Sequence, residues 1–314
     1  MEILMKTGKP NLANVYVAKM RDDPEYLVEF VDACGSNNGD RSRKWVIVIS
    51  TQFGCPVKCL MCDAGSEFKG NLTLQDLKFQ VMTVLSAHKE IDPQKCPKLK
   101  IQLARMGEPS LNDAVLELLL WLKDRYPNVI PCIATMTPHG RDRWFDRLLE
   151  IRDHFGDFQL QLSINSTDDA YRDKLMPYPK MKWRWLGDYG KKFFRRDQRK
   201  VCLNFAMSPD IPVNADRLRD YFDPSYFLVK LTPVNPTTAG SENQLTIADD
   251  RSAADSILRR KSAEFESVGF FVIQSIGDME ENLIGSNCGQ AVRQIKKLDD
   301  SDSLYNQYID SQIA

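Results

Sequence analysis

Short apolar runs rich in β-branched residues alternate with longer amphipathic stretches after about residue 45. The short runs predict strands and the longer stretches predict helices, because a strand buries alternate residues and a helix buries one stripe. The predicted strands are Trp45–Thr51, Leu99–Met106, Ile130–Thr137, Phe158–Ser163, Val201–Met207 and Phe227–Pro233. The predicted helices are Leu74–His88, Leu111–Tyr126, Asp142–Phe155, Trp183–Arg195, Ala215–Phe222 and Arg251–Val268. This alternation predicts an α/β fold of six βα units around a parallel sheet, as in a partial or full TIM-like barrel.

The flanking segments have different patterns. Val15–Lys19 and Tyr26–Ala33 alternate like a β-hairpin arm that turns near residues 21–24, and Gly269–Ile276 predicts one further strand. A polar, acidic loop then leads to Cys288 and a final polar helix. We therefore expect an N-terminal β arm at residues 1–44, a barrel at 45–277 and a C-terminal loop and helix carrying Cys288 at 278–314.

The composition is that of an ordinary globular protein. The 314 residues are 43% hydrophobic and 27% charged, with a net charge of −1, so the chain as a whole has no electrostatic attraction to nucleic acid or to a membrane. The N-terminus lacks the apolar core of a signal peptide, and no apolar stretch is long enough to cross a bilayer. Eight cysteines, three of them clustered, favour a reducing compartment. These features predict a cytoplasmic protein with no membrane partner.

Polar residues and cysteines recur where the predicted strands end. In barrels of parallel strands the reactive groups lie on the loops after the strand C-termini, because those ends meet at one mouth. Residues of this kind follow or end five of the six strands: Cys55, Gly107-Glu108-Pro109, Thr135, Ser163 and Asn235. We expect them to meet at one site.

Cys55, Cys59 and Cys62 form a C-x3-C-x2-C run directly after the first barrel strand. Three thiolates at this spacing can bind one face of an inorganic cluster and leave a fourth position open, whereas closed structural metal sites use four protein ligands. The alternatives are a zinc site completed by a distant Cys or His, or three unrelated core cysteines. The second C-x-x-C pair of a zinc ribbon is absent from the sequence. The run therefore favours a cluster that carries out chemistry.

This run, followed one βα unit later by Gly107-Glu108-Pro109, resembles the radical S-adenosylmethionine (SAM) superfamily. The resemblance implies a [4Fe–4S] cluster bound by Cys55, Cys59 and Cys62, with SAM chelating the fourth iron. It also implies a partial (βα)6 barrel, reductive cleavage of SAM to a 5′-deoxyadenosyl radical, and a reductant protein of the flavodoxin or ferredoxin type.

A narrower resemblance covers most of the chain. Six segments occur in the order found in the RlmN/Cfr group of radical SAM methylsynthases, which methylate adenosine carbons in RNA: residues 50–55, 106–109, 162–165, 172–177, 233–236 and 288–290. The resemblance implies that the SAM contacts are Gly107, Glu108, Thr135, Ser163, Asn165 and Asn235. It further implies that Cys288 is a methyl carrier, although an ordinary small core residue is the alternative at that position.

The chain departs from the group in two respects. The second essential cysteine of the group falls at Val48, and only about 45 residues precede the first barrel strand, where the group has an RNA-gripping helical domain. Cys34 could supply a thiol instead, but an incidental strand-end thiol is favoured. We therefore expect one-carbon transfer through Cys288 to a smaller, non-ribosomal substrate or nucleotide-type molecule. The alternatives are an RNA adenosine C-methyltransferase, and a hydrogen-abstraction or coupling enzyme in which Cys288 is not methylated.

Other features are predicted to be structural. The basic and aromatic stretch at residues 180–196 could bind phosphate and stack bases, but a helix with a basic outer face and an aromatic inner face is favoured. Cys96, Cys132 and Cys202 are expected to pack in the core. Glu25 and Glu29 lie roughly where the group has an acidic residue, and glutamates on a solvated strand edge explain them equally well.

Overall fold

A ten-stranded mixed sheet dominates the computed structural model, which describes residues 1–34, 39–65, 67–245, 251–276, 291–293 and 295. The strand order is β1-β2-β3-β4-β7-β8-β9-β10-β11-β12. The strands are β1 (Glu2–Lys9), β2 (Ala13–Lys19), β3 (Leu27–Cys34), β4 (Trp45–Ile49), β7 (Leu99–Leu103), β8 (Ile130–Thr135), β9 (Gln159–Ser163), β10 (Val201–Met207), β11 (Phe227–Pro233) and β12 (Val272–Gln274). A separate two-stranded sheet joins β5 (Gln52–Phe53) to β6 (Gly70–Asn71).

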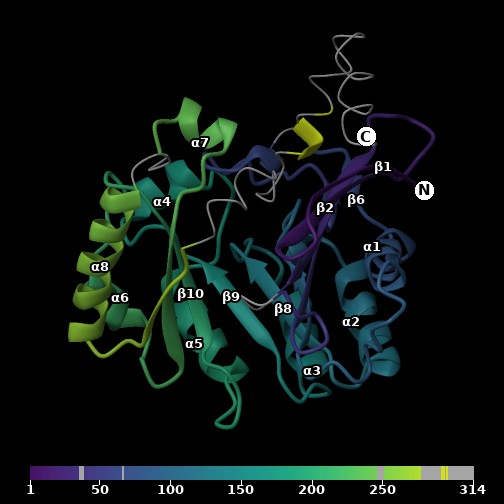
Figure 1. Ribbon diagram of the computed structural model, residues 1–314. Coiled ribbons are helices and arrows are strands. Elements are labelled where there is room, and N and C mark those ends of the chain that lie inside the picture. The colour runs from purple at the N-terminus through teal and green to yellow at the C-terminus, as the bar shows by residue number, and fades with distance from the viewer. Residues whose placement is uncertain (35–38, 66, 246–250, 277–290, 294, 296–314) are drawn as a thin grey trace.

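Strands β4 to β12 of the large sheet run parallel, and the helices between them cover its outer face (Figure 1). The helices are α1 (Leu74–Ser86), α2 (Ala114–Arg125), α3 (Asp142–Arg152), α4 (Asp169–Leu175), α5 (Trp183–Phe193), α6 (Ala215–Tyr221), α7 (Thr238–Glu242) and α8 (Arg251–Ser267), with 3-10 turns η1 (Asp63–Gly65) and η2 (Pro109–Leu111). All six predicted barrel strands and all six predicted helices are confirmed, with ends that differ by a few residues.

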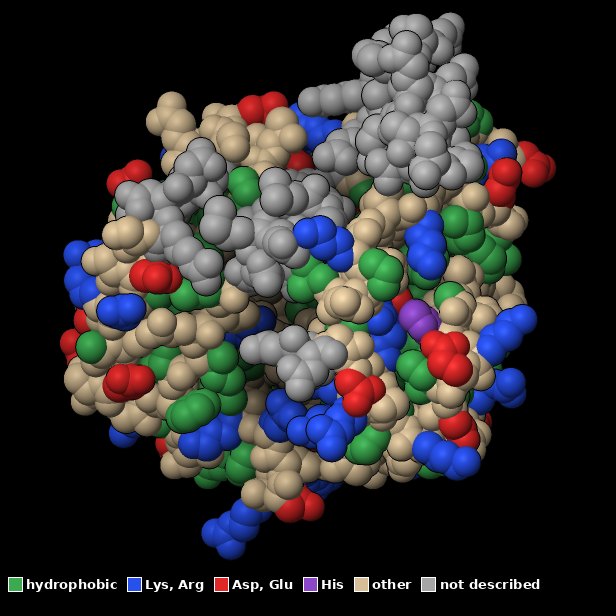
Figure 2. All heavy atoms as spheres, viewed as in Figure 1, with side chains coloured by type: hydrophobic (Ala, Val, Ile, Leu, Met, Phe, Trp, Pro, Cys, Tyr) green, Lys and Arg blue, Asp and Glu red, His purple; other side chains and the backbone are tan. Residues whose placement is uncertain are grey.

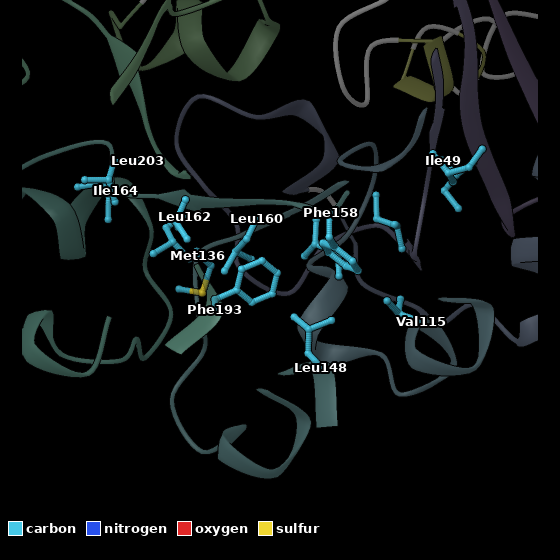
Figure 3. Packing of buried hydrophobic residues seen from close by; sticks show 14 of the residues in the cluster. Ile49, Val115, Met136, Leu148, Phe158, Leu160, Leu162, Ile164, Phe193 and Leu203 are labelled. Atoms are coloured by element: carbon cyan, nitrogen blue, oxygen red, sulfur yellow. The ribbon is translucent and has the colours of Figure 1, made fainter. Parts of the chain in front are cut away.

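The core lies between the sheet and these helices. On β4, Trp45, Ile47 and Ile49 are fully buried, while the intervening Val46 and Val48 are only half-buried on the inner face. The other elements contribute to the same layer, which includes Leu160 and Leu162 of β9 and Leu148 of α3 (Figure 3). Burial of each such side chain stabilises the fold by about 1.5–3 kcal/mol. This free energy determines that the apolar face of each strand turns toward the helices.

The N-terminal strands extend the same sheet. β1, β2 and β3 are antiparallel neighbours, and β3 pairs with the first barrel strand through Val31↔Val48 and Cys34↔Trp45. The predicted hairpin is confirmed: its turn is closed by the Met20 amide, which donates to the Tyr26 carbonyl at 3.0 Å. β1, α4 and α7 were not predicted.

The fold class predicted from the sequence is confirmed as an α/β partial barrel. In the described part of the chain no hydrogen-bonded ladder joins β12 back to another edge, so the barrel stays open. The division of the chain at residues 44 and 277 remains a prediction. Cys288, and the loop that carries it, lie outside the described residues.

Candidate functional site

The predicted site residues gather largely around one pocket at the carboxyl edge of the parallel strands. This pocket, here called the rim pocket, has a volume of about 180 Å³. The predicted residues that line it are Cys55, Cys59, Cys62, Gly107, Glu108, Ser163 and Asn165. They come from loops or strand ends that follow β4, β7 and β9, and parallel strands bring those ends together. Thr135 and Asn235 are not among its lining residues.

The cysteine loop (residues 54–62) is fixed by backbone contacts to three other segments. The Leu60 amide donates to the Leu175 carbonyl at 2.9 Å, and the hydroxyl of Thr237 donates to the Met61 carbonyl at 2.8 Å. At the start of the loop the Thr51 amide donates to the Met106 carbonyl at 2.7 Å. The three cysteines are half-buried in the resulting wall. The loop is thus positioned by the fold before any cofactor binds.

Asp63, the residue after the last cysteine, connects the cysteine loop to two distant parts of the chain. Its buried carboxylate accepts hydrogen bonds from the amides of Thr238 and Ala239 at the start of α7, at 3.0 and 2.8 Å. It also accepts one from Nη1 of Arg293 at 3.0 Å. A carboxylate at a helix N-terminus satisfies amides that have no partner within the helix. Asp63 therefore holds residues near the C-terminus against the cysteine loop.

Glu108 is buried, and its carboxylate lies at the centre of a hydrogen-bond network. Oε1 accepts from the amide and hydroxyl of Ser110 at 3.1 and 2.6 Å, and Oε2 accepts from the Met136 amide at 2.8 Å. Burial raises the pKa of Glu108, although these hydrogen bonds oppose the shift. The network fixes the orientation of the carboxylate in the pocket wall.

Gly107 has a conformation and surroundings that only glycine accommodates. Its φ is +99°, and a Cβ built there would lie 2.7 Å from both Oγ1 of Thr51 and Cβ of Gln52. The amide of Glu108 donates to Oε1 of Gln52 at 2.8 Å, which locks the turn to the cysteine-loop side. The Gly-Glu-Pro turn therefore lies tightly against the residues that precede Cys55.

The remaining predicted SAM contacts differ in their placement. Asn165 is buried with φ +60°, and its Oδ1 accepts from the Ala206 amide at 3.0 Å. Thr135 is 1% exposed and lies behind Glu108, where its Oγ1 accepts from the Thr137 amide at 2.9 Å. Asn235 is exposed on the loop after β11. Their proposed contacts with SAM remain predictions.

A buried ion pair that sequence reasoning missed borders the rim pocket. Nε of Arg105, which lines the pocket, lies 2.7 Å from Oε1 of Glu29, and the two side chains are 2% and 0% exposed. Oε2 of Glu29 accepts from the Val292 amide at 3.1 Å. Reading Glu29 as a solvated edge residue was wrong, whereas Glu25 is exposed and pairs with Lys69 at 2.7 Å. The partners of Glu29 lie far along the chain, so only its position inside an apolar strand could have signalled burial.

The donor set fits an open-sided cluster. In the described residues no three His, Cys, Asp or Glu side chains converge closely enough to hold one metal ion. A cluster binds each thiolate at a different iron and so spreads its ligands more widely than a single ion does. Burial raises the pKa of the Cys59 thiol, and the neighbouring Cys55 and Glu108 raise it further. A metal that binds this sulfur must therefore displace its proton.

The other cysteines lie away from this pocket. Cys34 lies opposite Trp45, the first residue of β4, whereas the cysteine loop follows the other end of that strand. Cys34 is therefore not placed to replace the missing thiol. Val48 packs on the inner face in the same apolar cluster as Cys62 and Val292. Cys96, Cys132 and Cys202 are all buried, as predicted: Cys96 belongs to the apolar core, whereas Cys132 and Cys202 contact polar side chains.

The inner face of the parallel strands is polar. Nε2 of Gln161 donates to Sγ of Cys132 at 2.7 Å, and Nδ2 of Asn204 donates to Oε1 of Gln161 at 2.9 Å, linking three adjacent strands. Lys100 and Lys230 alternate with buried apolar residues and so point to this face. Lys and Arg side chains are also scattered over the side of the molecule seen in Figure 2. Closed barrels of this type fill their interior with branched apolar residues. This interior is instead suited to a polar ligand.

Comparison with known proteins agrees with this geometry. No family model matches the chain. The probable dual-specificity RNA methyltransferase RlmN of Thermotoga maritima is 29% identical over 199 residues, which are 61% of this chain and 55% of that protein. The dual-specificity RNA methyltransferase RlmN of Marinobacter nauticus is 25% identical over 262 residues, 80% of this chain and 66% of that protein. The matched region thus spans between half and two thirds of these relatives.

A solved structure shares the fold. The crystal structure of a radical SAM methyltransferase from Sphaerobacter thermophilus superposes with a TM-score of 0.69 at 17% identity, covering 92% of this chain and 80% of that one. None of the helices in the described residues is long and apolar enough to cross a membrane. The chain is therefore similar in sequence to proteins named RlmN, and it shares the fold of a radical SAM methyltransferase.

Proposed function

We propose that the protein is a radical SAM enzyme in which Cys55, Cys59 and Cys62 bind a [4Fe–4S] cluster and the rim pocket binds SAM. The observation that carries this proposal is that the three cysteines and the Gly107-Glu108 turn line one pocket. When bound, the reduced cluster and SAM would supply a 5′-deoxyadenosyl radical. The similarity to proteins named RlmN supports the same reaction class.

The side chains of the rim pocket have complementary roles in this proposal. Glu108 offers a fixed carboxylate for the ammonium group of SAM, because hydrogen bonds to Ser110 and Met136 hold it in place. The Gly107 turn allows the backbone to approach closely, and Ser163 and Asn165 provide further polar groups. Thr135 acts through its neighbour, because its hydroxyl lies 3.1 Å from Oγ of Ser110. Asn235, exposed on its loop, would have to close over the bound molecule.

For the reaction class we propose one-carbon transfer through Cys288. Residues shortly after Cys288 are held at the site, since the Val292 amide donates to Glu29 and Arg293 donates to Asp63. Three Cα–Cα steps separate Cys288 from Ala291, which limits the distance between them to about 11 Å. This reach supports Cys288 as a thiol that meets the reacting groups.

For the substrate we propose a small or nucleotide-type polar molecule. The polar inner face supports this choice, because Lys100, Gln161 and Asn204 would be poor neighbours for an apolar substrate. Two relatives bear the name RNA methyltransferase, which supports RNA adenosine C-methylation as the second candidate. The electron would come from a flavodoxin- or ferredoxin-type protein.

Anaerobic reconstitution with iron and sulfide, followed by reduction and addition of SAM, tests the proposal. We expect about four irons per chain and formation of 5′-deoxyadenosine. Cys59→Ser should lose both, whereas Cys34→Ser, a matched change of a half-buried thiol at the opposite edge of the sheet, should keep both. Retention of iron without deoxyadenosine in the wild type would contradict the proposal.

Intact-mass measurement after incubation with SAM separates the reaction classes. One-carbon transfer predicts a methyl group that is absent from Cys288→Ser. A wild-type protein that makes deoxyadenosine but never gains a methyl group would favour hydrogen abstraction or coupling. Filter binding of RNA over a range of salt concentrations tests the RNA candidate, since phosphate contacts weaken with salt.

A further inference from the structure

A second, larger pocket lies between α4 and the start of α5. It has a volume of about 640 Å³, within the range of ligand-binding pockets. The residues that line it are His139, Asp169, Arg172, Asp173, Pro179, Lys180, Met181, Lys182, Trp183, Arg184 and Tyr221. We call it the α5 pocket. None of the six predicted SAM contacts belongs to it.

The N-terminus of α5 opens into this pocket. Lys182, Trp183 and Arg184 are the N-cap and first two residues of the eleven-residue helix, and all three line the pocket. Lys182 makes no side-chain capping bond, and the first turn contains no acidic residue. Within the described residues no acceptor contacts the amides of Trp183 and Arg184. Free amides and the positive end of the helix dipole favour an anion here.

Arg172 provides an independent indication of an anion. Its side chain is 4% exposed and lines the pocket, yet its Nη2 has no hydrogen-bond partner in the described chain. Its guanidinium lies 4.8 Å from the centre of the Trp183 ring, which holds it in place. Burial lowers the pKa of Arg172 to about 10, with Asp173 and Asp169 opposing the shift. A buried guanidinium with an unfilled donor is unfavourable unless a ligand completes it.

The charges around the pocket leave a positive excess. The two acidic side chains are already engaged, because Asp173 pairs with Lys180 at 2.7 Å and Asp169 pairs with Arg217 at 2.5 Å. Lys182 and Arg184 are exposed, and neither forms an ion pair within the described residues. Two or more uncompensated cations match a dianionic phosphate better than a single carboxylate.

An aromatic surface and a short path to the cysteine loop suggest what the phosphate is attached to. Tyr221 stacks on Trp183 with ring centres 5.9 Å apart and is 38% exposed, so a planar base can pack against it. Lys180 lines the α5 pocket, and its Nζ donates at 2.8 Å to the carbonyl of Met176, a residue that lines the rim pocket. Both α4 and the cysteine loop lie at the edge of the sheet where the parallel strands end (Figure 1).

We propose that the α5 pocket binds the phosphate group of a nucleotide, with the start of α5, Arg172, Lys182 and Arg184 as its recognition elements. Phosphate binding stands on the geometry of this pocket alone. The further step, that this phosphate belongs to the molecule modified at the rim pocket, rests on the proposed function.

Calorimetric titration of the cluster-free protein tests phosphate binding apart from SAM chemistry. The probes are guanosine 5′-monophosphate, guanosine and inorganic phosphate. We expect the monophosphate and inorganic phosphate to bind and guanosine to bind at least about tenfold more weakly than the monophosphate, since it lacks the charge-assisted bonds. Failure of both phosphate-bearing probes to bind would overturn the proposal.

Lys182→Asp is the most discriminating variant. Aspartate at the N-cap accepts from the helix amides and repels an anion, so this variant should melt at a higher temperature yet lose phosphate binding. Arg184→Ala should weaken binding at least about tenfold. Lys191→Ala, at the last turn of the same helix, is the matched control and should bind normally. Equal phosphate affinity in Lys182→Asp and the wild type would overturn the proposal.

The source of the phosphate is decided by a competition arm. A short single-stranded RNA that displaces the monophosphate, and loses affinity in Lys182→Asp, identifies an RNA phosphate at this site. No displacement by RNA identifies a free nucleotide. If phosphate binds normally but the reconstituted protein forms no deoxyadenosine, the proposed function fails and the α5 pocket proposal survives.

Discussion

Replacing Asp63 by Asn should destabilise the protein by about 3 kcal/mol. Oδ1 of Asp63 accepts from the Ala239 amide and from Nη1 of Arg293, while Oδ2 accepts from the Thr238 amide. Hydrogen bonds to a charged group contribute about 1.5–3 kcal/mol and neutral ones about 0.5–1.5 kcal/mol. Asn at this position keeps the Ala239 bond at neutral strength, keeps a charge-assisted bond from the Arg293 guanidinium, and turns its amide group toward the Thr238 amide. One bond weakened by about 1 kcal/mol and one lost bond of about 2 kcal/mol sum to the expected loss.

Urea denaturation of the full chain measures this loss. The matched control is Glu242→Gln, which removes the other carboxylate near Arg293, 3.3 Å from Nη2 and 62% exposed. Because an exposed ion pair contributes about 0–1 kcal/mol, the control should change stability by less than about 1 kcal/mol. If Asp63→Asn unfolds at the same urea concentration as the wild type, or the control costs as much, Asp63 does not connect the cysteine loop to α7 and Arg293 as described.

Two further changes test separate parts of the structure. Gly107→Ala should keep the cluster but weaken SAM binding by about tenfold or more. The added Cβ would meet Thr51 at a residue with a positive φ, a strain of about 1–3 kcal/mol. Unchanged SAM affinity in an equilibrium titration would contradict the described turn. Burial alone would raise the pKa of Asp32, but hydrogen bonds from Arg41, Asn14 and His88 outweigh it and lower the pKa. Asp32 therefore stabilises the fold above its unfolded pKa of about 3.9, and this stability is lost as pH falls through the lower folded value. Asp32→Asn should lower the free energy of unfolding by about 3–5 kcal/mol at neutral pH. It should also reduce the loss of stability that the wild type shows as the pH falls into the acid range. If the variant loses stability with acid as steeply as the wild type, other groups control that loss.

The barrel strands and outer helices were predictable because their pattern is local. Runs such as Val201–Met207 bury alternate residues against helices, and the sequence shows this pattern directly as an alternation of residue types. β1 was missed because its burial pattern is mostly exposed, with one buried residue, Met5. α4 has only seven residues, too few to display a helical period.

The composition of the rim pocket was predictable to the extent that it depends on strand ends. Parallel strands bring Cys55, Gly107 and Ser163 to one edge whatever the packing beneath them. The burial of Glu29 against Arg105 was not predictable, because it depends on which strand β3 pairs with. The same pairing places Cys34 beside the first residue of β4, at the end of the strand away from the cysteine loop. Side-chain direction also escaped prediction, as Thr135 and Asn235 illustrate.

The central claim is that SAM binds an open-sided cluster held by Cys55, Cys59 and Cys62. The most direct measurement is the electron paramagnetic resonance spectrum of the reduced, reconstituted protein with and without SAM. We predict a [4Fe–4S] signal that changes when SAM is added, because SAM occupies the iron that no cysteine binds. A cluster signal that SAM leaves unchanged, or no cluster signal at all, would contradict the account.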